Sequence, residues 1–268
     1  MGQLFNNILF IPILNVLLLL YKIFLTIHLP GAFGFSIIGL TVLIRLIFQP
    51  FFKQQMETAK KMQEMKPHLD RLNEKHKNDQ KTLQQEQLKL YQQYGINPAS
   101  GCLFMIIQIP IFIALYQVLY EPFKHGSLAA STTVLNKMAY SPFLKIDQAI
   151  NPWFLGFNIA ISPKQSGQLI YLLIPLVTAV LQYFQATAMT MPVSQPKKSE
   201  DGKQAKKNDS EDFQKAMNTQ MKFLFPVMIG WFSYTLPFGL SLYWNIFSLF
   251  SIIQGRELKA KSQITNNK

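Results

Sequence analysis

The sequence has little cysteine and little charge. Cys102 is the one cysteine among 268 residues, and only 15% of the residues are charged. A single thiol excludes an internal disulfide framework and a metal site built from several cysteines. Soluble domains average about 25% charged residues, so the shortage of charge argues against a soluble protein. Because the segment around Cys102 is apolar, we expect this cysteine to be a small residue of the core.

The signatures of common enzyme classes are missing. The sequence has no G-x-x-x-x-G-K-[ST], H-E-x-x-H or G-x-S-x-G motif, and these motifs hold nucleotides, zinc and a nucleophilic serine. The four histidines are scattered over segments expected at the surface: His28, His68, His76 and His125. We therefore expect no enzymatic activity, no metal, no cofactor and no small-molecule substrate.

Apolar runs, by contrast, are long and numerous. Hydrophobic residues make up 49% of the chain, and runs of about 20 apolar residues cross a bilayer as helices. We predict an all-α polytopic membrane protein with five transmembrane helices, an N-terminal interfacial helix and a cytoplasmic helical hairpin. The expected segments are the interfacial amphipathic helix (1–31), first span (32–52), hairpin (53–98), second span (99–120), extracytoplasmic loop (121–166), third span (167–187), flexible cytoplasmic loop (188–218), fourth span (219–236), fifth span (237–255) and basic cytoplasmic tail (256–268).

The N-terminal apolar segment has two interpretations. Asn15, Lys22 and Thr26 share one helical face, which favours a helix lying in the membrane interface over one that crosses the bilayer. No Lys or Arg precedes the segment and no small-residue cleavage site follows it, although a removable signal peptide normally has both. We therefore expect the mature protein to keep this segment.

The basic residues orient the predicted spans. Nine Lys and Arg lie in residues 53–98, seven in 188–222 and four in 256–268, against four in 121–166. Because Lys-rich and Arg-rich loops stay in the cytoplasm, we expect a multi-pass plasma-membrane protein with a cytoplasmic C-terminus. The formal net charge of +12 also indicates affinity for anionic lipids or ribosomal RNA.

Arg45 is the most informative single residue. It lies eight positions before Lys53, which is roughly 12 Å inside the first span at 1.5 Å per residue. A charge at that depth costs about a few kcal/mol and usually faces a cavity or a partner. A snorkelling arginine and a structural ion pair are the alternatives, but the predicted spans contain no Asp or Glu. We expect Arg45 to need water, lipid phosphate or an incoming substrate.

Polar side chains also repeat at helical spacing along the predicted spans. The sets are Thr41, Arg45 and Gln49 on the first span, Thr178, Gln182 and Gln185 on the third, and Trp244, Ser248 and Ser251 on the fifth, with Gln108 on the second. Such groups either face a shared hydrophilic cavity or join helices by hydrogen bonds. We favour the cavity for the whole set, whereas the two alternatives are equal for Gln108, Gln182 and Gln185.

The predicted hairpin carries two apolar stripes and a turn at residues 76–80. The first stripe contains Met62, Met65, Leu69 and Leu72, and the second contains Leu83, Leu90 and Tyr94. Pro67 is expected to kink or interrupt the first arm. The hairpin is either a solvated strut or a methionine-rich dock for incoming chains, and periodicity does not decide between them.

Together these segments resemble the YidC/Oxa/Alb family of membrane protein insertases. The hairpin motifs Lys66-Pro67 and Tyr91-Gln92-Gln93-Tyr94-Gly95-Ile96-Asn97-Pro98, followed by Gln108-Ile109-Pro110, look like the family's cytoplasmic hairpin and second core helix. Pro237-Phe238-Gly239-Leu240-Ser241-Leu242-Tyr243-Trp244 is similar to its fourth-to-fifth helix connection, and Leu43-Ile44-Arg45-Leu46 to the segment with its intramembrane arginine. The resemblance covers about residues 15–258.

The resemblance implies a five-helix core around a hydrophilic groove that opens to the cytoplasm and to lipid. Arg45 would be the cation of this groove and Gln185 and Trp244 would line it; the stripes add Thr41, Gln49, Gln108, Gln182 and Ser248. The implied partners of this monomer are newly made membrane proteins, the ribosome, the Sec translocon and anionic lipids. The chain would insert and help to fold membrane proteins, alone or with Sec, without nucleotide hydrolysis.

Three departures from the family pattern stand out. Gln182 is more polar than expected at its position, and the short basic tail weakens the inference of ribosome docking. We also expect the minimal form of the family, without a large extracytoplasmic domain.

Two other functions would account for the same sequence features. A solute transporter or channel would need a polar cavity, but the internal repeats typical of transporters are not seen. A structural scaffold for membrane proteins would tolerate the replacement Arg45→Ala.

Overall fold

The computed structural model describes residues 2–76, 79–96, 100–120, 128–189 and 220–266, and within them the chain is predominantly helical. The elements are α1 (Gln3–Phe5), a π-helical turn (Asn6–Phe10), α2 (Ile11–Thr26), α3 (Ala32–Ile47), α4 (Gln49–Lys75), α5 (Gln80–Gln93), α6 (Ser100–Tyr120), α7 (Leu128–Lys137), a 3-10 turn (Pro142–Leu144), β1 (Trp153–Phe154), β2 (Phe157–Asn158), α8 (Pro163–Ser166), a 3-10 turn (Leu169–Leu172), α9 (Leu173–Met189), a π-helical turn (Gln220–Leu224), α11 (Phe225–Thr235) and α12 (Phe238–Asn266). Apart from its first two residues, the predicted loop 188–218 lies outside the described residues.

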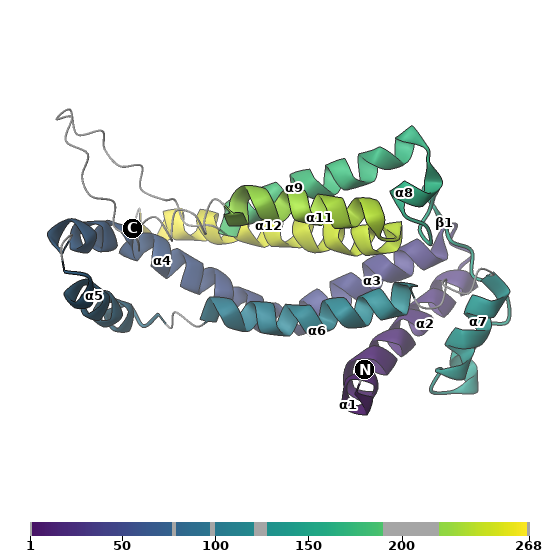
Figure 1. The fold of residues 1–268 in the computed structure, drawn as a ribbon. Helices are drawn as coiled ribbons and strands as arrows, with labels where there is room; N and C mark the ends of the chain where they lie inside the picture. Colours follow the sequence, from purple (N-terminus) through teal and green to yellow (C-terminus); the bar gives the residue numbers. More distant parts are fainter. Residues whose placement is uncertain (1, 77–78, 97–99, 121–127, 190–219, 267–268) are drawn as a thin grey trace.

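Helices α3, α6, α9, α11 and α12 form the central bundle (Figure 1). Their facing surfaces are apolar, and Ile37, Leu115 and Tyr243 are almost completely buried in one continuous core. A tight turn at Pro237 joins α11 to α12. The N–H groups of the two residues after it donate to backbone carbonyls at 161 and 159, so this turn is fixed to the segment that follows β2.

The first predicted span, residues 32–52, is not one straight helix, because the chain bends after α3. Helix α3 ends at Ile47, and α4 starts at Gln49 with its axis turned by 63°. Pro50 lies in the first turn of α4. A proline has no N–H to donate, and its ring crowds the carbonyl four residues earlier, which explains why one helix does not run through residues 32–52.

Length and composition identify two helices able to cross a membrane among the described residues. These are Gln3–Thr26 and Leu169–Thr187, and a third is added if Ala32–Ile47 and Gln49–Met62 count as one bent span. Within α6, residues Gln108–Tyr120 form a shorter apolar helix. The chain is thus helical and multi-pass, while the number of five spans stays a prediction.

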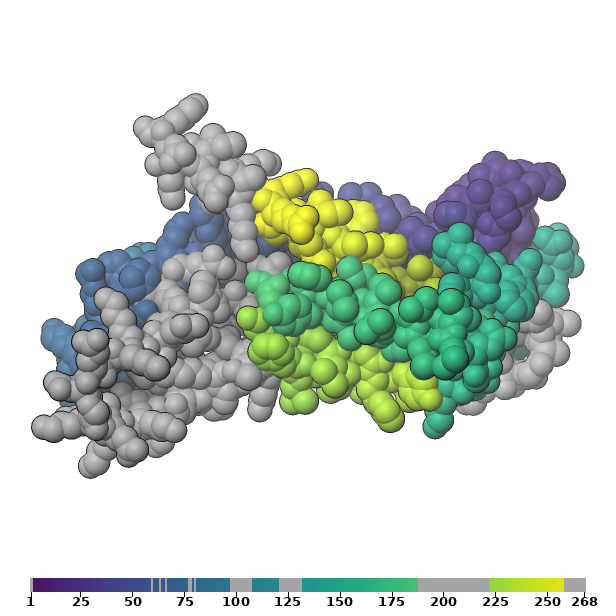
Figure 2. All heavy atoms as spheres, turned by 90° about the horizontal axis from the view of Figure 1, so that it is seen from above, coloured from purple at the N-terminus to yellow at the C-terminus, as the bar shows by residue number. Residues whose placement is uncertain are grey.

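One face of the bundle is strongly apolar on its outside. Figure 2 shows α9 and α11 side by side on this face. Their large exposed side chains include Leu173, Leu176, Val177, Val180, Phe184, Val227, Met228 and Trp231. An apolar surface of this extent is expected of helices that face lipid rather than water.

The polar face of the N-terminal helix contacts other segments of the same chain. Asn15 is 5% exposed; its side chain donates to the carbonyl of Met138 (3.1 Å) and accepts from the N–H of Tyr140 (2.7 Å). Lys22 donates to the carbonyl of Phe143 and lies over that ring. The polar face thus packs on residues 138–145, so its polarity alone does not require an interfacial helix. The interfacial placement stays a prediction.

Helices α4 and α5 pack as an antiparallel pair. The Asn73 side chain accepts from Gln87 (3.0 Å), and nearer the bundle Met65 and Leu69 pack with Leu90. The two stripes predicted from the sequence therefore face each other. Met65 has no exposed surface, which supports the strut interpretation for this stripe. Helix α4 continues through Pro67, so the proline does not interrupt the arm, and the kink that was the other expectation stays a prediction.

The bundle has two different ends (Figure 1). The α4–α5 pair and the C-terminal part of α12 lie at one end, whereas α7, the β1–β2 hairpin and α8 lie at the other. The sequence-based topology groups the same segments, but which end faces the cytoplasm stays a prediction. Two details differ from expectation. Helix α12 continues to Asn266 through most of the predicted tail, and residues 121–166 include a two-stranded pair with Trp153 opposite Asn158.

Candidate functional site

Arg45 lies inside the bundle, on the face of α3 that packs against α12. Only 1% of its surface is exposed. One terminal nitrogen donates to the backbone carbonyl of Phe247 (2.5 Å) and to the Ser251 hydroxyl, and the other lies 3.4 Å from the Gln254 amide oxygen. Arg45 therefore connects α3 to the half of α12 that we predict to lie nearer the cytoplasm.

Two aromatic rings enclose the guanidinium group. Its central carbon lies 4.0 Å from the ring centre of Phe52 and 3.7 Å from that of Phe247. A cation held over a ring away from water gains about 2 kcal/mol or more from the ring quadrupole. These contacts offset part of the cost of burying the charge.

The hydrogen-bonding partners of Arg45 among the described residues are all neutral. No ion pair joins it to a carboxylate within the described residues. Its Nε atom is buried without a hydrogen-bond partner in that part of the chain. The site is thus a buried cation whose hydrogen bonds are incomplete and whose charge is not neutralised.

Helix α12 connects to α9 and α11 through short polar side chains. The Gln182 amide donates to the Ser248 hydroxyl (3.1 Å). Ser233 of α11 donates to Thr178 of α9 (3.1 Å) and shares a 2.7 Å hydrogen bond with Ser241 of α12. These polar groups satisfy one another across helices, as in membrane bundles joined by small polar residues.

Two further contacts join α6 to α12. The Gln108 amide donates to the Tyr243 hydroxyl (2.8 Å), and Phe112 stacks on Trp244 with ring centres 5.2 Å apart. Gln108 and Gln182 thus each have an interhelical partner, which supports the hydrogen-bonding alternative for these two residues.

The other residues singled out from the sequence fall in different places. Thr41 is buried and donates to the carbonyl of Ile37 on its own helix. Gln49 is exposed because the bend after α3 removes it from the face of Arg45. The Gln185 oxygen is buried without a partner among the described residues, as is that of Asn245. The residues singled out from the sequence, except Gln49, therefore all lie within the bundle.

The sequence analysis missed Phe52, Phe247 and Gln254 as neighbours of Arg45. Phe247 and Gln254 lie four residues before and three residues after Ser251, which belongs to a recognised polar stripe. Extending that stripe at helical spacing therefore offers a signal for both residues. Phe52 lies seven residues after Arg45, which is also a helical spacing, but it follows the bend, so periodicity alone does not predict its contact with Arg45.

In the described part of the chain, no group of three or more His, Cys, Asp or Glu side chains is placed to hold a metal ion. Buried polar atoms around Arg45 are amides, hydroxyls and carbonyls. Such a site is able to hold an anion or water, and it offers no nucleophile paired with a base.

Known proteins resemble the chain over nearly its whole length. It is 30% identical over 239 residues to the inner membrane ALBINO3-like protein 2 of Chlamydomonas reinhardtii, covering 88% of this chain and 51% of that protein. It is 34% identical to the inner membrane protein PPF-1 of Pisum sativum, covering 85% and 49%. It is 31% identical to the membrane protein insertase YidC of Leptospira interrogans, covering 93% and 34%.

The chain thus spans about half or less of the length of these curated relatives. The family model described as 60Kd inner membrane protein matches residues 24–264, which include Arg45 and all five helices of the bundle. This protein therefore belongs to the 60Kd inner membrane protein family, the YidC/Oxa/Alb family.

Proposed function

We propose that this protein is a membrane protein insertase and chaperone. It receives newly made membrane proteins, helps their hydrophilic segments across the bilayer and releases their apolar segments into lipid. Relatives named as insertases support this proposal. The observation that carries it is Arg45, a buried cation whose partners in the described part of the chain are neutral.

The contacts of Arg45 suggest how a substrate would be recognised. A carboxylate in the translocated segment would accept charge-assisted hydrogen bonds, which are roughly twice as strong as neutral ones. The contact to Gln254, at 3.4 Å, is the longest and the easiest to replace. The free Nε atom offers a further donor. The incoming acid would thus complete and neutralise a site that the described residues leave incomplete.

A hydrophilic groove is the remaining part of the proposal. We propose that Thr41, Gln108, Gln182, Gln185, Trp244 and Ser248 line it beside Arg45, and that Gln49 lies at its mouth. For a substrate to enter, the contacts between α6 and α12, Gln108 to Tyr243 and Phe112 to Trp244, would have to separate. Transfer of the substrate's apolar helix into lipid then drives the step, because burial of apolar surface is favourable.

The proposed setting is the plasma membrane, with five spans and with the α4–α5 pair and the C-terminus in the cytoplasm. In that orientation the basic end faces the ribosome, the Sec translocon and anionic head groups, which we propose as partners. The protein would act as a monomer, alone or with Sec.

Reconstitution tests the proposal directly. The purified protein is placed in liposomes with a short single-spanning substrate, and protease protection of the translocated tail is measured against empty liposomes. We expect the protein to protect the tail. Equal protection in empty liposomes would reject the insertase and direct attention to solute flux. Insertion that survives Arg45→Ala unchanged would show that Arg45 has no role in transfer.

A further inference from the structure

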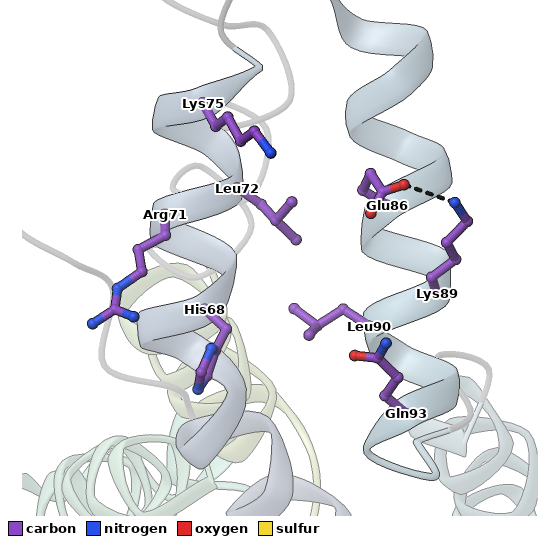
Figure 3. A pocket seen from close by; sticks show the side chains of 8 residues that line it. All are labelled: His68, Arg71, Leu72, Lys75, Glu86, Lys89, Leu90 and Gln93. Atoms are coloured by element: carbon purple, nitrogen blue, oxygen red, sulfur yellow. Dashed lines mark hydrogen bonds and ion pairs between the residues drawn. The ribbon is translucent and has the colours of Figure 1, made fainter.

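The α4–α5 pair contains a pocket that the proposed function does not use. Figure 3 shows it between the two helices. Its volume is about 280 Å³, and it is lined by His68, Arg71, Leu72, Lys75, Glu86, Lys89, Leu90 and Gln93. This space is below the usual range of small-molecule sites, roughly 300–1,000 Å³, and therefore suits one or two side chains of a larger partner.

The rim of the pocket is cationic. Arg71 and Lys75 lie one helical turn apart on α4, and no ion pair joins either to a carboxylate within the described residues. On α5 the one carboxylate of the rim, Glu86, is paired with Lys89 at 2.7 Å. Lys75 points toward the space between the helices, whereas the Arg71 guanidinium group projects outward at the rim (Figure 3). Both charges thus lie at the edge of a pocket whose single acid is already paired.

The floor of the pocket is apolar. Leu72 and Leu90 project from opposite helices into the space between them (Figure 3). Leu90 is nearly buried, and Leu72 is half-buried at the edge of the hairpin core. A ligand that fits must therefore present an apolar group to the floor and acidic groups to the rim.

The position of the pocket argues against a lipid ligand. Arg71 lies 22 residues beyond Gln49 on α4, which is roughly 33 Å of helix. Figure 1 shows this helix pair extending away from the end of the bundle. The pocket is thus far from the level at which head groups would surround the bundle.

We propose that this pocket binds an acidic amphipathic peptide segment presented by a protein partner. Its carboxylates pair with Arg71 and Lys75, and one apolar side chain packs on Leu72 and Leu90. A nucleic acid fits less well, because phosphodiesters offer nothing apolar to the floor. Binding at this pocket is separate from Arg45 and does not depend on insertase activity.

Fluorescence anisotropy with the full-length protein in detergent tests this site. The probe is a short labelled peptide with Leu and Glu at helical spacing. We expect saturable binding, and weakening by about tenfold or more in Arg71→Glu/Lys75→Glu, because charge reversal turns attraction into repulsion at both positions. Replacing Glu by Gln, or Leu by Ser, in the peptide should weaken binding as well.

A matched variant distinguishes the pocket from the general positive charge of the hairpin. Lys53→Glu/Lys81→Glu makes the same change in net charge at exposed residues of α4 and α5 outside the pocket, and we expect less than about a twofold effect. Equal weakening by both double variants overturns the proposal. So does a pocket-dependent preference for RNA or for anionic vesicles over the peptide. The neutral double variant Arg71→Gln/Lys75→Gln should bind the peptide with intermediate affinity. Circular dichroism of this variant checks that its helices still form, so that weaker binding is not due to misfolding.

Discussion

Arg45 is accommodated in the bundle without an anion. Two rings, one carbonyl and one hydroxyl surround its guanidinium group, and the Gln254 amide lies at the limit of hydrogen bonding. Removal of a buried charge that lacks a counter-ion is often neutral or stabilising. We therefore expect Arg45, the residue that we propose to recognise substrate, to contribute little to stability.

Arg45→Met separates these two roles. We expect the midpoint of thermal unfolding in detergent to stay the same or rise, because an apolar chain of similar length replaces an uncompensated charge. Insertion should fall at the same time. A fall in the unfolding midpoint together with unchanged insertion would mean that Arg45 is chiefly structural.

Gln182 tests the alternatives of cavity and interhelical hydrogen bond. Gln182→Leu removes one hydrogen bond to Ser248, whose hydroxyl still donates to the carbonyl of Trp244 (2.8 Å). Interhelical hydrogen bonds in membranes average about 0.6 kcal/mol, so we expect a loss of this size in unfolding free energy. If Gln182 lines the groove, insertion of acidic substrates should fall more than this small loss explains. Normal insertion would leave it a purely structural residue.

At the scale of elements, the α5 helix depends on its first turn. Asp79 caps α5 by accepting from the backbone N–H (3.1 Å) and the hydroxyl (2.6 Å) of Thr82. These hydrogen bonds lower the pKa of the Asp79 carboxyl below its ordinary value of 3.8. The stabilisation is therefore present above that ordinary value and is lost as the pH falls through the lower pKa of the folded state.

Asp79→Ala should loosen the start of α5. At neutral pH we expect faster amide hydrogen exchange in residues 80–84 of the variant, with little change in α4. The difference from wild type should shrink only when the pH falls below about 4, where the carboxyl of the wild type becomes protonated. A difference that is constant down to acidic pH would show that the carboxylate does not cap the helix.

Helical periodicity predicted most of the elements, whereas bends and partners between helices depend on tertiary contacts. The stripes of Met65 and Leu90 were recognisable because each repeats at 3.6-residue spacing. The bend at Phe48 was not recognisable from the sequence, because an apolar run continues through Pro50. The polar face of Asn15 was recognised, but its partner lies 123 residues away at Met138. The same limit applies to the site, where the contact of Phe52 with Arg45 crosses the bend.

At the scale of the whole molecule, the two ends of the bundle differ in character. The α4–α5 pair and the end of α12 form one end, and the segment from α7 to α8 forms the other. If the bundle crosses the membrane, these ends lie on opposite sides. The N-terminal helix contacts the second end through Asn15 and Lys22, so its polar face belongs to that side.

Cysteine labelling tests this arrangement in a Cys102→Ala background. We expect Lys81→Cys to react with a membrane-impermeant reagent only when the cytoplasmic side is opened, and Lys145→Cys to react from outside. Both side chains are exposed. Gln3→Cys should also react from outside if the N-terminal helix is interfacial. Reaction of Gln3→Cys only from the cytoplasm would instead make this helix a span, and equal behaviour of positions 81 and 145 would contradict the topology.

The most direct test of the insertase proposal is a double-mutant cycle between Arg45 and the substrate. Protease protection in liposomes is measured for substrates with acidic or amide side chains in the translocated tail, with wild type and with Arg45→Gln. We predict that removing the acids reduces insertion severalfold in wild type and has little effect in Arg45→Gln, because the two changes remove the same interaction. Equal losses in both backgrounds would contradict recognition of substrate carboxylates by Arg45.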